Sequence, residues 1–178
     1  MKKLFILPIL LMTLFLGSCK KESLQTYIVD RKDNPKFMTV DFSTNTIPLM
    51  NELDEEGQEA LKSIRKMNIA FLSKKNASEA ELKDEAVKIK TILKATNYKT
   101  LMRFNDKRGK GAIYYIGESD AIDEIVGFVN AEEVGVGVAR VLGNDMNPAT
   151  ILKMLKKAKI DGSGNEFDGL RSILQGMK

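Results

Sequence analysis

The stretch YKTLMRFNDKRGKGAIYYIG, residues 98–117, decides the fold class of this chain. Its two ends, residues 98–104 and 111–117, are rich in aromatic and β-branched residues, and a short loop that contains Gly109 separates them. Two β-rich runs joined by such a loop are typical of an antiparallel hairpin. We therefore predict a β-hairpin over residues 98–117.

A second hairpin is predicted immediately downstream. DEIVGFV (residues 123–129) and EVGVGVARVL (residues 133–142) are again β-rich, and only residues 130–132 separate them. A parallel, doubly wound sheet would need a helix between consecutive strands, and these turns leave no room for one. The late half of the chain therefore predicts antiparallel pairing.

Upstream of the hairpins, strands alternate with helices. We predict strands at residues 37–43 and 67–73, with a helix at residues 53–66 between them. The next helix, residues 78–95, begins with a Ser-x-x-Glu capping box and carries apolar residues at helical spacing. The first half of the chain therefore supplies two strands and two helices.

A last helix is predicted after the second hairpin, because Asn147 and Pro148 suit the start of a helix over residues 149–159. The order of elements predicts an α+β fold, with a largely antiparallel sheet and helices packed on one face. We expect four regions: a signal peptide of the lipoprotein type (1–18), a lipid-anchored tether (19–36), a single α+β domain (37–160) and a flexible C-terminal tail (161–178).

The amino-terminal residues predict where the protein is located. Two lysines precede an apolar run at residues 4–16, which suits a signal peptide and is shorter than the roughly 20 residues of a membrane span. The run ends in LGSC, residues 16–19, which resembles the lipobox of bacterial lipoproteins. This resemblance implies cleavage between Ser18 and Cys19, and attachment of acyl chains such as palmitate to Cys19. An ordinary cleaved signal peptide that contains a lone cysteine is the alternative.

Lipid on Cys19 would anchor the mature chain, because two or three acyl chains hold a domain stably on a membrane. Lys20 follows the cysteine in place of the aspartate that retains many lipoproteins in the inner membrane. We therefore expect an outer-membrane lipoprotein, on the periplasmic side by default. Surface exposure stays open, although Glu22 is the only acid close to the cysteine.

Composition excludes several functions. Removing residues 1–18 removes two of the 28 basic residues and leaves a formal charge of +2, so charge gives no support for a nucleic-acid partner. The chain has no histidine and one cysteine, which excludes catalytic triads, Cys–His dyads and histidine metal sites. We expect no enzyme, no cofactor and no metal.

Carboxylates are the main groups left for catalysis, beside a serine–lysine pair. The carboxylates occur in three groups. Two acids in different environments could act as general acid and general base. These groups lie at a helix start and in turns, however, where acids are usually solvated. Residues 161–172 also resemble a calcium loop, yet Glu166 and Ser172 replace its glycine and its final glutamate, so a flexible loop is favoured. The acid groups are Asp54, Glu55 and Glu56; Asp120, Asp123 and Glu124; and Glu132 and Glu133.

Two features are candidate partner-binding surfaces. The last helix has a lysine face with Lys153, Lys156 and Lys157, which suits an anionic partner but is more often simply solvated. In the last strand, Gly135 and Gly137 alternate with an apolar side that we assign to the core beneath the helices. The glycine side then serves either close packing within the chain, which we favour, or docking of a partner. The apolar side comprises Val134, Val136, Val138 and Leu142.

Several phrases, in this order, resemble one known family: LQTYIV, FMTVDFS, ALKSIRKMNIAFL, YKTLMRFND, IDEIVGFV and VGVGVARVLG. They are similar to Bacteroidetes lipoproteins that carry domain of unknown function 4252, over nearly the whole mature chain. The resemblance implies a lipid-anchored α+β domain of the cell envelope. The family has no established activity or catalytic residues, and its association with sigma-factor systems hints at envelope signalling.

The sequence thus favours a lipid-anchored envelope protein that acts as a non-enzymatic binding or signalling module at the outer membrane. Its partners would be the membrane, through lipid on Cys19, and an envelope protein or wall component. The alternative is an envelope enzyme that uses carboxylates or a serine–lysine site without histidine.

Overall fold

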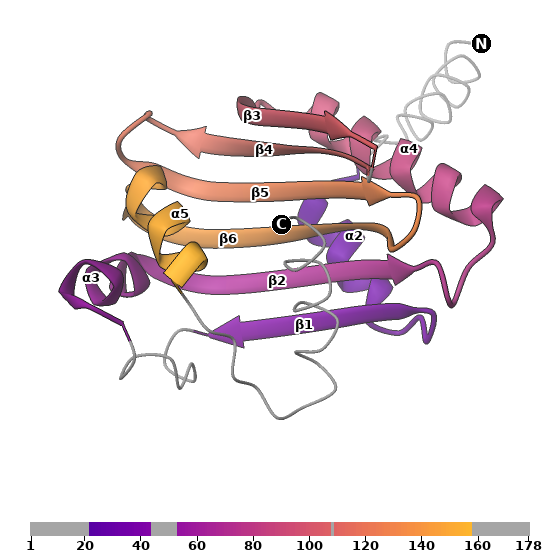
Figure 1. Cartoon of the computed structure of the whole chain (residues 1–178), viewed down its shortest axis with the longest axis horizontal. Coiled ribbons are helices and arrows are strands. Elements are labelled where there is room, and N and C mark those ends of the chain that lie inside the picture. The colour runs from indigo at the N-terminus through magenta and orange to yellow at the C-terminus, as the bar shows by residue number, and fades with distance from the viewer. Residues whose placement is uncertain (1–21, 44–52, 108, 158–178) are drawn as a thin grey trace, which may run out of the picture.

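The computed structural model of the chain describes residues 22–43, 53–107 and 109–157. Six strands form one sheet, and four helices lie on or beside it (Figure 1). The elements are, in chain order, α2 (Leu24–Arg31), β1 (Phe37–Ser43), α3 (Glu55–Ser63), β2 (Ile64–Ser73), α4 (Glu79–Ala95), β3 (Lys99–Asp106), β4 (Gly109–Gly117), β5 (Ile122–Ala131), β6 (Gly135–Met146) and α5 (Pro148–Lys157).

The strand order is β1-β2-β6-β5-β4-β3, and every neighbouring pair is antiparallel. Both predicted hairpins are present, as β3–β4 and β5–β6. After β2 the chain crosses to the far edge through α4 and returns strand by strand until β6 pairs with β2. The prediction of an α+β fold with an antiparallel sheet is therefore confirmed.

Local sequence accounts for the starts of two helices. Ser78 Oγ accepts a hydrogen bond from the Glu81 backbone N–H at 3.3 Å, and Glu81 Oε2 accepts one from the Ser78 N–H at 2.9 Å, which completes the predicted capping box of α4. At α5, Asn147 Oδ1 accepts hydrogen bonds from the backbone N–H groups of Ala149 and Thr150. Both helix starts agree with the prediction.

The boundary between α3 and β2 differs from the prediction. The helix ends at Ser63, and β2 begins at Ile64, three residues before the expected strand. Ile64 pairs with Gly143 of β6 and is 2% exposed, so it belongs to the sheet and to the core at once. Tertiary pairing with β6 thus outweighs the helical pattern of the last residues.

One face of the sheet is covered by α2 and α4, which lie behind the sheet in Figure 1. Alternate strand residues point to this face, and Val136 and Val138 are 0% and 3% exposed beneath the two helices. The core assignment of these two valines is confirmed. Val134 instead packs on the opposite face, because Gly135, with a φ of +140°, interrupts the alternation.

The segment predicted as a tether contains part of this core. Ser23 caps α2, and the side chains of Leu24, Tyr27 and Ile28 are at most 2% exposed. The packed part of the chain therefore begins near residue 23 rather than at residue 37. Residues 22–32 suit a short helix within the tether, but the sequence does not predict the burial of that helix, because one apolar stripe on an otherwise polar segment also suits a solvated linker.

The opposite face carries helices as well. Leu61 of α3 and Ile151 of α5 pack with Ile125 and Val141, which alternate with residues of the first face. In Figure 1, α5 lies in front of β5 and β6. The expectation that the helices pack on one face is thus not confirmed. The strands are apolar on both sides at this end of the sheet, so helices cover both faces there.

Candidate functional site

A shallow hollow of about 320 Å³ lies where α4 passes the β3–β4 hairpin. Its residues come from four consecutive elements, α4, β3, β4 and β5, and α4 reaches this place because it crosses the sheet between β2 and β3. The lining comprises Lys90 of α4, Arg103, Phe104 and Asn105 of β3, Lys110, Gly111, Ala112 and Tyr114 of β4, and Phe128 of β5.

The register of three strands explains why the surface is hollow there. Arg103 stands opposite Ala112, and Ala112 stands opposite Phe128, so one row across the sheet has a methyl group between two long side chains. Ala112 and Phe128 are both 4% exposed, whereas Arg103 is exposed. The small residue forms an apolar floor, and the longer side chains form the walls.

The rim of the hollow is cationic. Lys90, Arg103 and Lys110 are all exposed, and within the described ranges none of them forms an ion pair with a carboxylate. Some other cations of the domain are paired, as Lys88 of the same helix α4 is with Glu22 at 3.0 Å. Among the described side chains, the lining contains no carboxylate, so these residues offer N–H donors and positive charge to a ligand.

A buried ionic network lies on the same face of the sheet, between α2 and β3. Arg140 donates from Nε and Nη2 to the two carboxylate oxygens of Glu124, at 2.8 and 2.9 Å. Tyr98 donates its hydroxyl to the same carboxylate, and Arg140 also donates to Gln25 of α2. The network ties α2 to β5, β6 and the start of β3.

Burial and charge shift the acid–base properties of this network. Burial, with the hydrogen bond to Glu124, raises the pKa of Tyr98 well above its ordinary value. Burial acts to lower the pKa of Arg140, but the hydrogen bonds and charge of Glu124 outweigh it and raise that pKa. Tyrosine and arginine thus keep their protons, which suits a structural role for this group.

The family is identified by comparison with known proteins. A family model described as Domain of unknown function (DUF4252) matches residues 27–154, which is most of the chain. The chain belongs to the DUF4252 family. No match was found among curated proteins or among solved structures. The matched range includes most of α2, which supports counting that helix with the DUF4252 domain.

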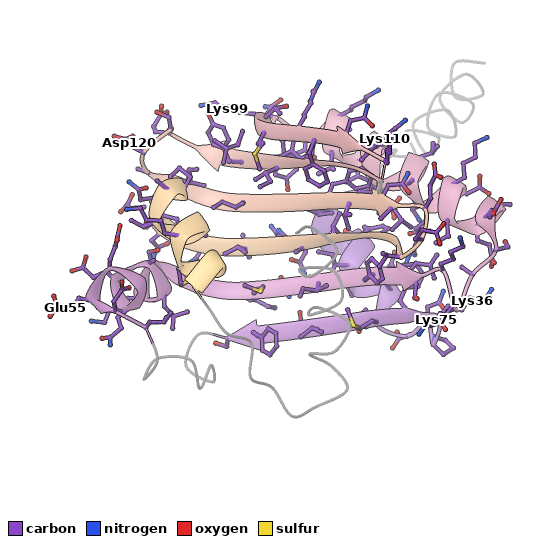
Figure 2. The ribbon with its side chains drawn as sticks, in the orientation of Figure 1. Lys36, Glu55, Lys75, Lys99, Lys110 and Asp120 are labelled. Carbon is purple, nitrogen blue, oxygen red and sulfur yellow. The ribbon has the colours of Figure 1, made fainter. Side chains whose placement is uncertain are left out.

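The predicted acid groups of this DUF4252 protein do not converge. Asp54 caps α3 by accepting from the Gly57 N–H at 3.0 Å, and Glu56 pairs with Lys153 at 2.8 Å. Asp120 and Asp123 are exposed, and Figure 2 shows Asp120 at the end of the β3–β4 hairpin opposite to Lys110. Glu132 and Glu133 are exposed in the β5–β6 turn.

Glu124 departs from the expectation of a solvated acid. It lies within β5, is 7% exposed and is held by Arg140 and Tyr98. A charged pair at diagonal positions of two apolar strands was the signal that could have shown this, since Glu124 pairs with Leu142 and Arg140 pairs with Val126. Recognising the pair needed the β5–β6 register.

The glycine side of β6 is covered from within the DUF4252 domain. A Cβ added to Gly137 would stand 2.8 Å from Phe71 Cδ2 and 2.5 Å from the Ala70 carbonyl oxygen. A Cβ on Gly135 would stand 2.2 Å from the Leu72 carbonyl oxygen. Both positions agree with the close-packing alternative, while docking of a partner at these glycines stays a prediction.

The lysine face of α5 is described in part. Lys153 is exposed and forms the ion pair with Glu56, so it contacts α3. The backbone of Lys156 and Lys157 belongs to α5, and their side chains lie outside the described part. Ser18, Cys19 and the calcium-like loop at residues 161–172 also lie outside the described residues.

Two further observations concern only the described residues. None of their helices is long and apolar enough to cross a membrane. No group of three or more carboxylates or cysteines among them is arranged to hold a metal ion.

Proposed function

We propose that this DUF4252 protein is a lipid-anchored, non-enzymatic binding module at the outer membrane, on its periplasmic side. Cys19 carries the acyl chains, and the folded domain contacts a component of the envelope. The amino-terminal signal, the LGSC motif and Lys20 support the anchor and the membrane. The protein's role is contact rather than turnover.

One observation carries the non-enzymatic part of the proposal. In the described lining, the hollow has three cations and no carboxylate, while the acids serve as a helix cap, as ion-pair partners or as solvated turn residues. General acid–base catalysis needs a proton donor or acceptor beside the bound ligand. A lining of unpaired cations instead suits the binding of an anion.

The alternative enzyme needs a different lining. A carboxylate site would bring two acids together, and a serine–lysine site would place a hydroxyl next to an amine. Lysines line the hollow, but neither a serine nor an acid stands with them in the described lining. This composition favours the binding module over the enzyme.

Photocrosslinking in intact cells tests the proposal. A photoreactive side chain at Asn105, which is exposed and lines the hollow, should capture an envelope component that mass spectrometry identifies as lipid, protein or wall material. The same probe at Glu55 on α3, which Figure 2 shows far from the hairpin, is the matched control. Equal capture at both positions, or none at Asn105, would contradict binding at the hollow.

A further inference from the structure

We propose that the hollow beside α4 binds the phosphate group of an anionic membrane lipid. The inference rests on the proposed function, whose lipid anchor brings the domain to a bilayer, and it names the ligand class of the hollow. Three observations carry it: the free donors of the cations, the exposed apolar residues of β3, and the place where the described chain begins.

The cations can turn several donors toward one anion. Arg103 presents a planar fork of N–H groups that fits two phosphate oxygens, and lysine adds a compact charge. The Nη2 atom of Arg103 is 3.4 Å from Thr100 Oγ1, a weak contact that leaves its other donors free. The ammonium of Lys90 is 5.5 Å from the ring centroid of Phe128, in the wall of the hollow.

Two exposed apolar residues precede Arg103 on the edge strand β3: Leu101 is 39% exposed and Met102 is 47% exposed. Met102 pairs with Ile113 and Arg103 pairs with Ala112, so these two side chains project to opposite faces of the sheet and flank its free edge. The register of β3 and β4 shifts between Thr100 and Met102, which leaves Leu101 outside the regular pairing. Apolar residues next to basic ones are typical of surfaces that rest on anionic bilayers, where the apolar groups enter the headgroup region.

Glu22, the first residue that the structure describes, contacts α4, the helix that borders the hollow. Glu22 Oε1 is 3.0 Å from the ammonium of Lys88 on α4, two residues before Lys90. Cys19 precedes Glu22 by three residues, which span at most about 11 Å whatever path they take. Lipid on Cys19 would therefore hold α4 near the bilayer. Lys90 and the hollow lie on a different side of this helix from Lys88, about one helix diameter of 10–12 Å away.

The test uses the full acylated protein in vesicles of phosphatidylcholine with increasing fractions of phosphatidylglycerol. Because lipid blocks the thiol of Cys19, Asn105→Cys, at an exposed position in the lining of the hollow, supplies a single thiol for a polarity-sensitive dye. We expect phosphatidylglycerol, and not phosphatidylcholine alone, to shift the dye emission to the blue. The phosphatidylglycerol fraction at half-maximal shift should rise about fivefold for each of Lys90→Gln and Arg103→Gln.

Matched controls separate this site from charge in general. Lys75→Gln removes the same charge from an exposed loop and should leave the titration within twofold of the parent, and thermal unfolding by circular dichroism checks the fold of every variant. Equal shifts in both lipids, or a parental titration by the Lys90→Gln, Arg103→Gln double variant, would overturn the proposal. A shift produced by inorganic phosphate and not by phosphatidylglycerol would also overturn it, in favour of a soluble phosphate ligand.

Failure of the anchor is distinguishable from failure of the hollow. If Cys19 carries no lipid, the proposed function fails, and co-sedimentation of the unacylated chain with phosphatidylglycerol vesicles tests the hollow with the same variants. Loss of co-sedimentation in Lys90→Gln and Arg103→Gln, but not in Lys75→Gln, would support the lipid-phosphate site by itself. Co-sedimentation equal to the parent in all variants would overturn it.

Discussion

Arg140 of β6 donates hydrogen bonds from Nε and Nη2 to both carboxylate oxygens of Glu124 on the neighbouring strand β5, at 2.8 and 2.9 Å. The two side chains are 13% and 10% exposed, so water screens the pair weakly. Tyr98 from the start of β3 and Gln25 from α2 complete the contacts. This group of side chains joins α2 to β5 and β6.

Arg140→Met should lower the free energy of unfolding by about 3 kcal/mol or more, because it leaves a buried carboxylate without its cation. Urea denaturation followed by circular dichroism measures the loss. The control is Lys153→Met, which breaks the exposed pair with Glu56 and should cost at most about 1 kcal/mol. Similar losses in both variants would show that burial does not strengthen the Arg140–Glu124 pair.

The sequence predicted the parts of the fold that depend on local chemistry. The turn between β3 and β4 and the capping box at Ser78 are each contained in a few residues, so both could be read directly. The burial of α2 and the place of β6 beside β2 depend on contacts with elements that are distant in the sequence, and no local pattern contains that information.

The candidate site, too, could be predicted only in the part that depends on residues close together in the sequence. Register within the hairpin could place Arg103 and Lys110 on one side of β3 and β4, since Asn105 pairs with Lys110 and Arg103 with Ala112. Lys90 joins them only because α4 crosses that face of the sheet. In the sequence each of these cations resembles an ordinary surface residue, and only the fold shows that they share one hollow.

Gly137→Ser should destabilise the domain by about 1 to 3 kcal/mol, because its Cβ would press on Phe71 and on the Ala70 carbonyl. Gly127→Ser on the neighbouring strand is the matched control, since a Cβ there would meet only the Ala139 carbonyl oxygen, at 4.0 Å. Thermal and urea unfolding of both variants measure the difference. A stable Gly137→Ser protein that loses a crosslinked partner would favour the docking alternative for this side of β6.

Glu81 should make the stability of α4 sensitive to acid. Hydrogen bonds from Lys36 and from the backbone and hydroxyl of Ser78 lower the pKa of Glu81 to about 2. An unfolded glutamate titrates near about 4.3, so the stabilisation is complete above about pH 5 and is lost as pH falls toward 2. Glu81→Gln should therefore be less stable than the parent at pH 7, with the gap closing in acid.

Urea denaturation of the parent and the Glu81→Gln protein at pH 7, 4 and 2.5 checks this dependence. Glu79→Gln, in the same first turn of α4, is the control and should show a smaller change with pH, because Glu79 forms no ion pair within the described ranges. A gap between the parent and Glu81→Gln that stays constant from neutral to acid pH would contradict the assigned role of the carboxylate charge.

The anchor at Cys19 is the central claim, and metabolic labelling with a fatty-acid analogue tests it most directly. Cells that express the parent or Cys19→Ser are labelled and fractionated, and the amino terminus of the protein is determined by mass spectrometry. We predict a parent that is labelled, membrane-bound and acylated at residue 19, and a Cys19→Ser protein without label. Label retained by Cys19→Ser, or a parent with an unmodified cysteine, would contradict the account.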